Sequence, residues 1–322
     1  MIFSHIYVEK RALGYPLTER ILSSFPGSVV IEIGHYKDVF NRKHQDFRAQ
    51  AASRKMILAV NDGQRLYETA PVCQDFEVKR SCYSENAMNC IFDCGYCFLK
   101  GMYPGANLVV FVNLQDFEND VDGLLEKGPV HINTSYETDL PAINGFTGLS
   151  DFWTDLALKR EELTIELRTK SAPSSFVPSE RVIYAFSLSP EEIVNRFEHG
   201  TAPLASRLGA INRALDQNAS VRICFDPLIY VKDHVECYGK FMDQVVSSVD
   251  MKKVRDVSIG SFRISKDYLK QLRRNSGDTC VLYPFENREG YCVYPDGVRE
   301  RLSSLVRDRL LEVMEGGKIY EY

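Results

Sequence analysis

Three closely spaced cysteines are the residues of this chain best suited to chemistry. Cys90, Cys94 and Cys97 lie in one short stretch, with three and then two residues between them. Thiolates bind zinc and iron–sulfur clusters, and both kinds of centre usually take four protein ligands. Three ligands leave one metal position open for a second molecule. A fourth ligand from Cys73 or Cys82 would instead complete a structural zinc site, so the spacing alone leaves both centres open.

The composition indicates a globular chain with reduced thiols. The 322 residues are 44% hydrophobic, which is enough for a sizeable core. No run of about 18 apolar residues occurs, so we expect no membrane span. Residues 1–5 lack a secretory signal pattern, and nine cysteines without one favour reduced thiols in the cytoplasm over a disulfide framework. A net charge of -5 is unlike that of a general nucleic-acid coat, although it allows a local basic patch.

The elements that must position the cysteines follow an alternating pattern. From residue 107 onward, apolar runs of strand type alternate with segments of helix type, which is typical of parallel βαβ units. We therefore expect an α/β fold with a partial (β/α)6 barrel, whose site lies at the carboxyl ends of the strands. The cysteine loop would follow the first barrel strand at that edge. The expected strands cover residues 108–112, 130–134, 163–168, 182–187, 221–225 and 257–262.

The two ends of the chain are expected to add smaller units to this barrel. Residues 1–80 are predicted to form an N-terminal α/β segment, and residues 81–275 form the barrel. Residues 276–322 are predicted to form a β-hairpin followed by an amphipathic helix. The hairpin strands are expected at 281–285 and 291–294, with glycine in the turn.

The cysteine spacing, with Tyr96 directly before the third cysteine, resembles the radical S-adenosylmethionine superfamily. In that superfamily three thiolates hold a [4Fe–4S] cluster, S-adenosylmethionine binds the fourth iron, and its cleavage yields a 5′-deoxyadenosyl radical. Several stretches together resemble one family within it, the spore photoproduct lyases, which reverse a thymine lesion in DNA by breaking a carbon–carbon bond. These stretches are residues 6–17, 90–99, 135–139, 168–170 and 197–204.

The resemblance implies roles for further residues and for partners. The three cysteines would hold the cluster, and Thr138, Lys170 and Ser187 match positions that contact S-adenosylmethionine. Implied partners are damaged duplex DNA and an electron donor such as flavodoxin or ferredoxin, with no membrane. The family fold is a partial α/β barrel with a C-terminal hairpin that enters duplex DNA.

Two positions depart from the family where the product radical receives its hydrogen atom. The family's hydrogen-donating cysteine is replaced by Tyr136. Of two tyrosines that flank the third cluster cysteine, Tyr96 is kept and the other is Phe98, which has no O–H. Three explanations follow. Tyr136 donates the hydrogen atom, or another thiol does so (Cys292 on the hairpin, or one of the two thiols upstream of the loop), or the substrate differs.

Two groups of residues could contact DNA. Residues 252–274 hold eight lysines and arginines against two aspartates, an excess that could neutralise phosphates or simply face solvent. Tyr283, Phe285, Tyr291 and Tyr294 could stack on a flipped base or form the core side of the hairpin. Two alternatives to lesion reversal are therefore a radical enzyme of the same family that modifies another base, and a non-catalytic, zinc-stabilised nucleic-acid binding module.

Overall fold

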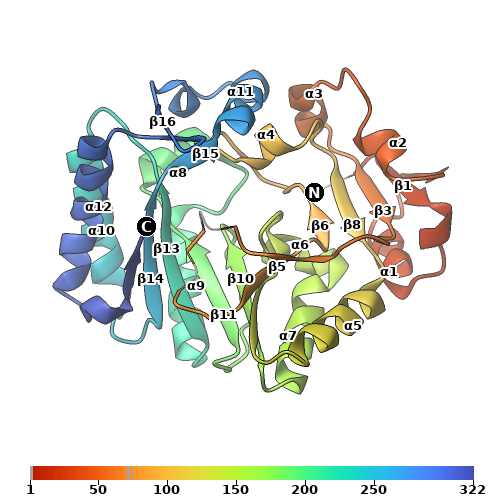
Figure 1. Ribbon diagram of the computed structural model, residues 1–322, viewed down its shortest axis with the longest axis horizontal. Coiled ribbons are helices and arrows are strands. Elements are labelled where there is room, and N and C mark those ends of the chain that lie inside the picture. The colour runs from red at the N-terminus through yellow and green to blue at the C-terminus, as the bar shows by residue number, and fades with distance from the viewer. Residues whose placement is uncertain (1–2, 71–72, 75) are drawn as a thin grey trace.

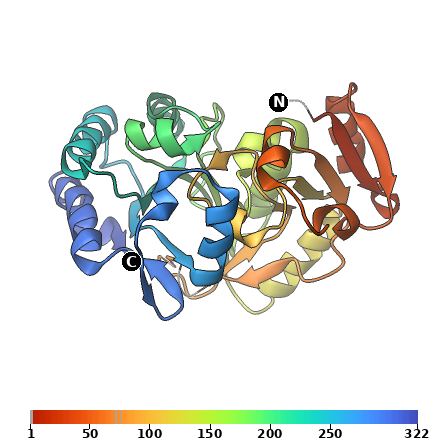
Figure 2. The same ribbon diagram turned by 90° about the horizontal axis from the view of Figure 1, so that it is seen from above.

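The computed structural model describes residues 3–70, 73–74 and 76–322, and most of its strands belong to two sheets (Figure 1). The N-terminal elements lie at one end of the molecule and the C-terminal helices at the other (Figure 2). In the described part of the chain, no helix is long and apolar enough to cross a membrane. All nine cysteines are free thiols.

The first sheet has five strands, and the three N-terminal strands form one side of it. Its order is β2 (Val29–Ile33), β1 (His5–Glu9), β3 (Met56–Ala59), β8 (Leu108–Phe111) and β6 (Ala87–Met88). The strand over 108–111 was expected in the barrel, but it pairs with β3 in this sheet. The division of the chain at residue 80 therefore stays a prediction. Accompanying helices are α1 (Pro16–Ser24), α2 (Lys37–Phe40), α3 (Phe47–Ala52) and α5 (Leu114–Leu125).

A buried carboxylate explains part of the N-terminal sequence signature. Glu9 is fully buried and accepts hydrogen bonds from Arg11 Nε at 2.8 Å, from the Tyr36 amide at 2.7 Å and from the Val60 amide at 3.1 Å. These donors come from three separate segments that follow β1, β2 and β3. Glu9 thus ties the carboxyl ends of these strands together, since a buried charge is tolerated when it is paired and hydrogen-bonded.

The second sheet is the partial barrel. It contains β4 (Leu66–Glu68), β5 (Ser81–Ser84), β9 (Val130–Asn133), β10 (Leu163–Thr169), β11 (Val182–Ser187), β13 (Ser220–Leu228), β14 (Asp256–Ser261) and β18 (Ile319–Glu321). All adjacent strands are parallel except β4 and β5. The helices between them are α6 (Leu140–Thr147), α7 (Leu149–Lys159), α8 (Glu191–Phe197), α9 (Leu204–Asp216) and α10 (His234–Ser248). The predicted barrel is confirmed.

The C-terminal hairpin is present, but its first strand was placed wrongly. Residues 279–282 form a 3-10 turn, and β16 (Glu286–Arg288) begins only afterwards, because Pro284 has no N–H for a strand ladder. β16 pairs with β17 (Tyr291–Val293) through a two-residue turn whose Glu289 and Gly290 both have positive φ. β15 (Arg263–Ser265) completes this small sheet. Helix α11 (Lys266–Asn275) lies between β15 and β16 in the sequence, and α12 (Asp296–Leu311) follows β17.

Candidate functional site

The cysteine loop begins at a left-handed residue. Asn89 has φ +68°, and its side-chain amide donates to the carbonyls of Gly105 at 2.8 Å and Asn107 at 2.9 Å. Asparagine tolerates this conformation better than most residues. The turn at Asn89 therefore fixes the direction in which the chain enters the loop at Cys90.

The middle of the loop is held by a short antiparallel ladder. β7 (Asp93–Cys94) pairs with β12 (Glu198–His199), and the Gly95 amide donates to the carbonyl of Phe197 at 2.7 Å. A Cβ at Gly95 would overlap the carboxyl group of Asp278, so only glycine fits there without movement. The loop is thus fixed on two sides by segments distant in the sequence.

Glu198 is the centre of a buried network beneath the cysteines. Both Glu198 and Arg207 are excluded from solvent, and Arg207 Nη2 lies 2.5 Å from Glu198 Oε2. Tyr96 donates its phenolic hydrogen to Glu198, and Ser189 Oγ donates to the same oxygen at 2.8 Å. Burial raises the pKa of Glu198, but Lys170 and Arg207 outweigh it and lower the pKa. Burial raises the pKa of Tyr96 far above its usual value, so Tyr96 keeps its proton as a donor.

The end of the loop rests on α11. The loop continues into α4 (Leu99–Met102), and a Cβ at Gly101 would overlap the backbone of Tyr268 on α11. Asn275 Nδ2 donates to the carbonyl of Lys100 at 2.6 Å. The buried Lys100 amine lies 2.8 Å from Asp93 Oδ1. These contacts place the residues after the third cysteine against the helix that precedes the hairpin.

Cys94 is buried and Cys90 and Cys97 are half-buried, in a partly cationic environment. Burial raises the pKa of Cys90 to about 12, and it also raises the pKa of Cys94 and Cys97. The Arg54 guanidinium partly offsets this at Cys90, and it donates to the Ile91 carbonyl at 2.5 Å. No group of three or more His, Cys, Asp or Glu side chains among the described residues is arranged around one metal ion. A cubane cluster instead takes each thiolate on a separate iron.

Three adjacent barrel strands bring the predicted cofactor-binding residues to the edge that carries the loop. Thr138 follows β9, Lys170 follows β10, and Ser187 ends β11. Lys170 Nζ lies 5.9 Å from the centre of the Tyr96 ring. Asp139 joins two of these strand ends, because it accepts from the Lys170 amide at 2.6 Å and from Thr169 Oγ1 at 2.7 Å.

Two buried hydroxyls at this edge have no hydrogen-bond partner among the residues that the structure describes. They are Thr138 Oγ1 and Ser135 Oγ, on residues that are 6% and 7% exposed. An unpaired buried polar atom is costly and points to a ligand or an ordered water. Three thiols on one loop suit a [4Fe–4S] cluster. The two hydroxyls at the same edge suit S-adenosylmethionine bound beside that cluster.

Tyr136 lies among aromatic rings and next to a thiol. Its ring centre is 5.6 Å from that of Phe98 and 4.4 Å from that of Tyr83. Its phenolic oxygen lies 3.6 Å from Cys73 Sγ. Burial, and next the presence of Cys73, raises the pKa of Tyr136 well above its ordinary value. The third proposed donor, Cys292, is buried in the middle of β17, opposite Asn287 and Ile264.

The hairpin aromatics divide into core and surface. Tyr294 is fully buried, and its hydroxyl oxygen accepts from the Tyr230 amide at 3.1 Å. Tyr283 and Phe285 pack against it, with ring centres 4.7 and 5.1 Å away. Tyr291 is exposed beside the turn. Of the four, Tyr294 belongs to the core, Tyr283 and Phe285 are half-buried against it, and Tyr291 is the exposed side chain that could stack on a base.

Only some of the basic side chains in residues 252–274 are free to contact DNA. Arg255 pairs with Glu180 at 2.8 Å, and Arg273 donates to the carbonyls of Val281 and Tyr283 at 2.8 and 3.0 Å. The exposed cations on α11 are Lys266, Lys270, Arg273 and Arg274, on the helix that packs against the end of the cysteine loop.

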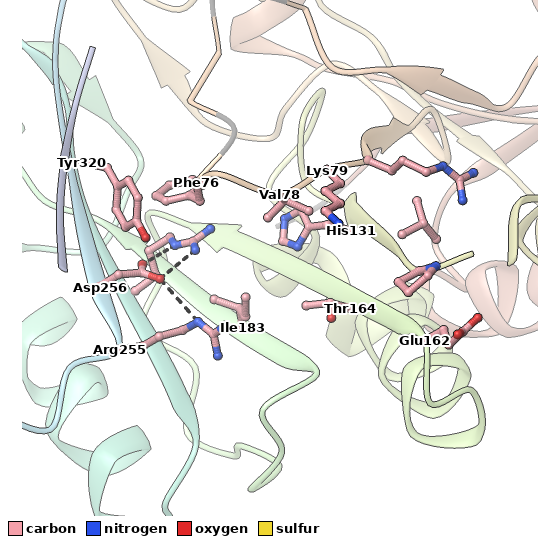
Figure 3. Close-up of a pocket in the computed structure, with 14 residues that line it drawn as sticks. Phe76, Val78, Lys79, His131, Glu162, Thr164, Ile183, Arg255, Asp256 and Tyr320 are labelled. Atoms are coloured by element: carbon pink, nitrogen blue, oxygen red, sulfur yellow. Dashed lines mark hydrogen bonds and ion pairs between the residues drawn. The ribbon is translucent and has the colours of Figure 1, made fainter. Parts of the chain in front are cut away.

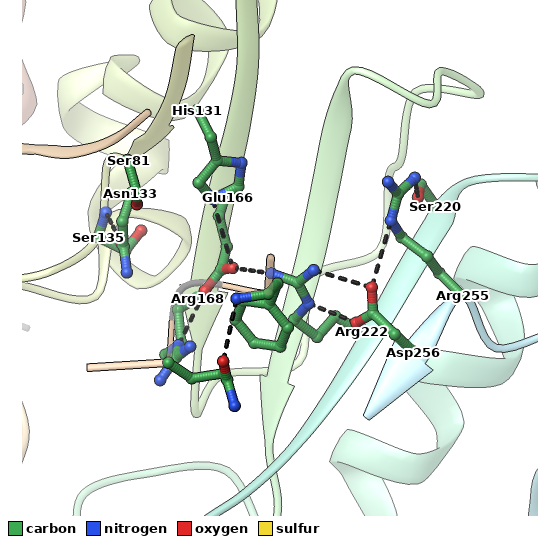
Figure 4. Close-up of polar contacts among 12 residues, drawn as sticks. Ser81, His131, Asn133, Ser135, Glu166, Arg168, Ser220, Arg222, Arg255 and Asp256 are labelled. Carbon is green, nitrogen blue, oxygen red and sulfur yellow. Dashed lines mark hydrogen bonds and ion pairs between the residues drawn. The ribbon is translucent and has the colours of Figure 1, made fainter. Parts of the chain in front are cut away.

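The barrel interior holds a chain of buried charges (Figure 4). Glu166 lies 2.9 Å from Arg168 Nε and 2.5 Å from Arg222 Nη1, and Arg222 also binds both carboxylate oxygens of Asp256 at 2.5 and 2.8 Å. Burial raises the pKa of Glu166, but Arg168 and Arg222 outweigh it and lower the pKa to about 2. A pocket of about 310 Å³, lined in part by His131, Arg222 and Asp256, opens at the amino ends of these strands, away from the cysteine loop (Figure 3).

The fold and this site define a class of protein: radical S-adenosylmethionine enzymes, which carry a three-cysteine loop at the carboxyl edge of a partial barrel. A family model described as spore photoproduct lyase matches residues 1–275, so the chain belongs to the spore photoproduct lyase family. The chain is thus a radical S-adenosylmethionine lyase acting in DNA repair, and the resemblance drawn from the sequence is confirmed. No curated protein sequence matches the chain.

Solved structures of spore photoproduct lyase share the whole fold. A variant with bound AdoMet and dinucleoside spore photoproduct has a TM-score of 0.80 and 16% identity, covering 100% of this chain and 98% of its own. A complex with dinucleoside spore photoproduct has a TM-score of 0.80 and 16% identity, over 99% and 98% of the two chains. A further variant has a TM-score of 0.81 and 17% identity, over 100% and 98%. At this identity the comparison supports the fold.

Several supporting residues were not identified from the sequence. Asn89 could have been found from its place directly before the loop, because asparagine often adopts positive φ. Glu198 lies in a stretch that carried the family resemblance, but nothing in the sequence predicted its ladder with Cys94. Arg54 and Arg207 had no sequence signal, since their roles depend on contacts with distant segments.

Proposed function

We propose that this enzyme reverses a methylene-linked thymine dimer of the spore photoproduct type in DNA. The observation that carries the proposal is the family match over residues 1–275 together with a loop that holds Cys90, Cys94 and Cys97 beside two unpaired buried hydroxyls. Cys90, Cys94 and Cys97 would hold a [4Fe–4S] cluster, and Thr138 Oγ1 would contact S-adenosylmethionine. When bound, this pair of cofactors supplies hydrogen-atom abstraction from the substrate by a one-electron route.

The chain's own residues orient and shield this chemistry. Glu198 pairs with Cys94 in the β7–β12 ladder, and Arg207 holds Glu198 in place. The ion pair therefore fixes the position of the cysteine loop. Lys170 places a positive charge over the Tyr96 ring, at the edge where S-adenosylmethionine would lie. This charge would attract the carboxylate of the cofactor. The buried strand ends exclude water, which strengthens the polar interactions that hold the cofactor. Tyr136 stands at the same edge with a hydrogen atom to give.

We propose that the substrate is presented as duplex DNA. Lys266, Lys270 and Arg274 on α11 are exposed on the helix that supports the cysteine loop, and Tyr291 is exposed on the neighbouring hairpin. Such an arrangement would contact phosphates and one base near the site. The electron donor would be a low-potential protein such as flavodoxin or ferredoxin. Nine free thiols agree with a reducing compartment such as the cytoplasm.

The test is anaerobic turnover of the reconstituted enzyme. Reduced protein, S-adenosylmethionine and an oligonucleotide with one spore photoproduct are mixed, and thymine and 5′-deoxyadenosine are both quantified. We expect both products from the wild type and neither from Cys94→Ala. 5′-Deoxyadenosine without repaired thymine would refute lesion reversal.

A second candidate function has one specific observation in its favour. Tyr136 and Phe98 lie at the two positions where the family carries its hydrogen-donating cysteine and second tyrosine, and their rings are neighbours. A different base or nucleotide as substrate would fit such a change. Oligonucleotides with other lesions, assayed in parallel, would detect it. The alternative of a non-catalytic zinc module does not agree with membership of this family.

A further inference from the structure

A thiol from outside the barrel strands reaches Tyr136. Cys73 belongs to the connection between β4 and β5, and its sulfur lies 3.6 Å from the phenolic oxygen of Tyr136, within the range of a hydrogen bond to sulfur. Phe76, three residues later, lies beneath Arg222 of β13, with the guanidinium carbon 3.2 Å from the ring centre. Through Cys73 and Phe76, the connection is therefore packed against the segment that follows β9 and against β13.

The contact lies where a ligand is indicated by independent evidence. Ser135 and Thr138 flank Tyr136 on the same loop, and their buried hydroxyls have no hydrogen-bond partner in the described part of the chain. Cys73 is half-buried and is the hydrogen-bonding partner found for Tyr136. Cys82, the other upstream thiol, is buried on β5, opposite Glu68 and Ile132. Cys292 is buried within the hairpin sheet. Among the described residues, Cys73 is therefore the upstream or hairpin thiol that contacts Tyr136.

We propose that Cys73 and Tyr136 form a two-residue hydrogen-atom relay that quenches the product radical of the repair reaction, with Cys73 as the final donor. The proposal rests on the proposed function, because it needs a carbon radical on the repaired thymine. Thiol S–H and phenol O–H bonds are of similar strength, so a hydrogen atom can pass between them with little change in energy. A relay needs the two groups in contact, which is what the 3.6 Å distance provides.

The steps balance in atoms and electrons. The Tyr136 O–H bond breaks homolytically, and a C–H bond forms on the methylene carbon of the product. The Cys73 S–H bond then breaks, its hydrogen atom restores the Tyr136 O–H, and a thiyl radical remains on sulfur. One electron from the flavodoxin- or ferredoxin-type donor and one proton from water return the thiol.

The test compares Cys73→Ser with the wild type in the full-length, reconstituted enzyme. Serine keeps a hydrogen bond to Tyr136, but its O–H bond is too strong to give a hydrogen atom. Over many turnovers we expect 5′-deoxyadenosine to form, while repaired thymine per 5′-deoxyadenosine falls about tenfold or more, because Tyr136 gives its hydrogen atom once and serine cannot restore it; a factor of ten corresponds to about 1.4 kcal/mol of barrier. In D₂O the wild-type thymine should carry one deuterium from the exchangeable donor.

Electron paramagnetic resonance gives a readout that is separate from product analysis. In Cys73→Ser the unpaired electron should stay on Tyr136, as a tyrosyl signal that narrows when ring-deuterated tyrosine is incorporated. Tyr136→Phe should lack this signal and also lose thymine. Tyr136→Cys in the Cys73→Ser background places a thiol at the strand end and should restore thymine. Cys237→Ala, which removes a half-buried thiol on α10, is the matched control and should behave as wild type.

The possible failures are distinguishable. Equal thymine per 5′-deoxyadenosine in Cys73→Ser and wild type would overturn the relay and leave lesion reversal standing. Full thymine in Tyr136→Phe would overturn the role of Tyr136 in the relay. No thymine from the wild type would overturn the proposed function and the relay with it. Circular dichroism and S-adenosylmethionine binding, both unchanged in Cys73→Ser, would show that the variant is folded.

Discussion

Removing the Arg207 guanidinium should expose how strongly the cysteine loop depends on its buried ion pair. In Arg207→Met the carboxylate of Glu198 loses its partner at 2.5 Å while remaining excluded from solvent. The carbonyls of Ser187 and Ala202 lose donors that now lie at 2.9 and 2.8 Å. Methionine fills similar volume, so the change removes charge and hydrogen bonds without opening a large cavity.

The magnitude follows from the burial of both ions. Removing one partner of a buried pair costs about 3–5 kcal/mol, because the other charge is left uncompensated. That is a large share of the roughly 5–15 kcal/mol that stabilises a typical domain. Since Glu198 lies opposite Cys94 in the ladder, the loss should also loosen the loop and lower the iron content after reconstitution. Urea unfolding of the metal-free protein under anaerobic conditions measures the first effect.

A matched control separates burial from charge. Arg196 pairs with Glu192 at 2.6 Å, but both side chains are nearly half exposed, so Arg196→Met should change the free energy of unfolding by less than about 0.5 kcal/mol. Adding Glu198→Gln to Arg207→Met should recover part of the loss, because a neutral amide costs less to bury than an unpaired carboxylate. If Arg207→Met lowered the free energy of unfolding by under about 1 kcal/mol, the ion pair would not hold the loop as described.

Three further predictions concern the cofactors and the pH dependence of stability. Alanine at Cys90, Cys94 or Cys97 should lower the bound iron and abolish 5′-deoxyadenosine formation, as measured by iron and sulfide analysis and by chromatography. Thr138→Val should weaken S-adenosylmethionine binding several-fold, as measured by isothermal titration. It should also raise the free energy of unfolding of the cofactor-free protein by up to about 1 kcal/mol, as measured by urea unfolding, because the unpaired hydroxyl is removed. Burial lowers the pKa of His131 from 6.5 to about 4, so the unfolded chain binds a proton at a higher pH than the folded chain. The free energy of unfolding should therefore fall by up to about 3 kcal/mol as the pH drops from 6.5 to 4. In a His131→Gln variant the free energy of unfolding should depend less on pH over this range.

The barrel could be predicted because its strands carry their own signal. Parallel strands buried on both faces tend to be apolar runs, and β11 has that character, whereas β9, β10, β13 and β14 mix apolar residues with polar ones. β18 has three residues at the sheet edge, too few to give a pattern. β8 has the same apolar character as β11, and only its pairing with β3 shows which sheet it joins. Very short strands, and apolar strands that could join either sheet, can therefore be assigned only from the three-dimensional structure.

The site could be predicted where residue type alone determines chemistry. Three cysteines in one loop indicate a metal centre wherever the chain folds, and the order of the strands places Thr138, Lys170 and Ser187 at one edge. The supports of the loop could not be predicted, because each joins it from a distant segment. Arg207 and Glu198 are of types that are usually exposed, and only the structure shows them fully buried.

The two departures from the family pattern meet at one place in the fold. Phe98 on the cysteine loop and Tyr136 after β9 are neighbouring rings, so the loss of a hydroxyl at one and the change from thiol to phenol at the other alter the same small region. Cys73 approaches this region from the connection between β4 and β5 and contacts Tyr136. The family pattern would place the hydrogen-donating thiol at position 136 and a second phenol at position 98. Here a phenol stands at position 136, in the segment that follows β9, and a thiol is supplied by the connection between β4 and β5. Both chemical groups needed to return a hydrogen atom are thus kept at the same strand end, although neither occupies the position from which the sequence pattern would predict it.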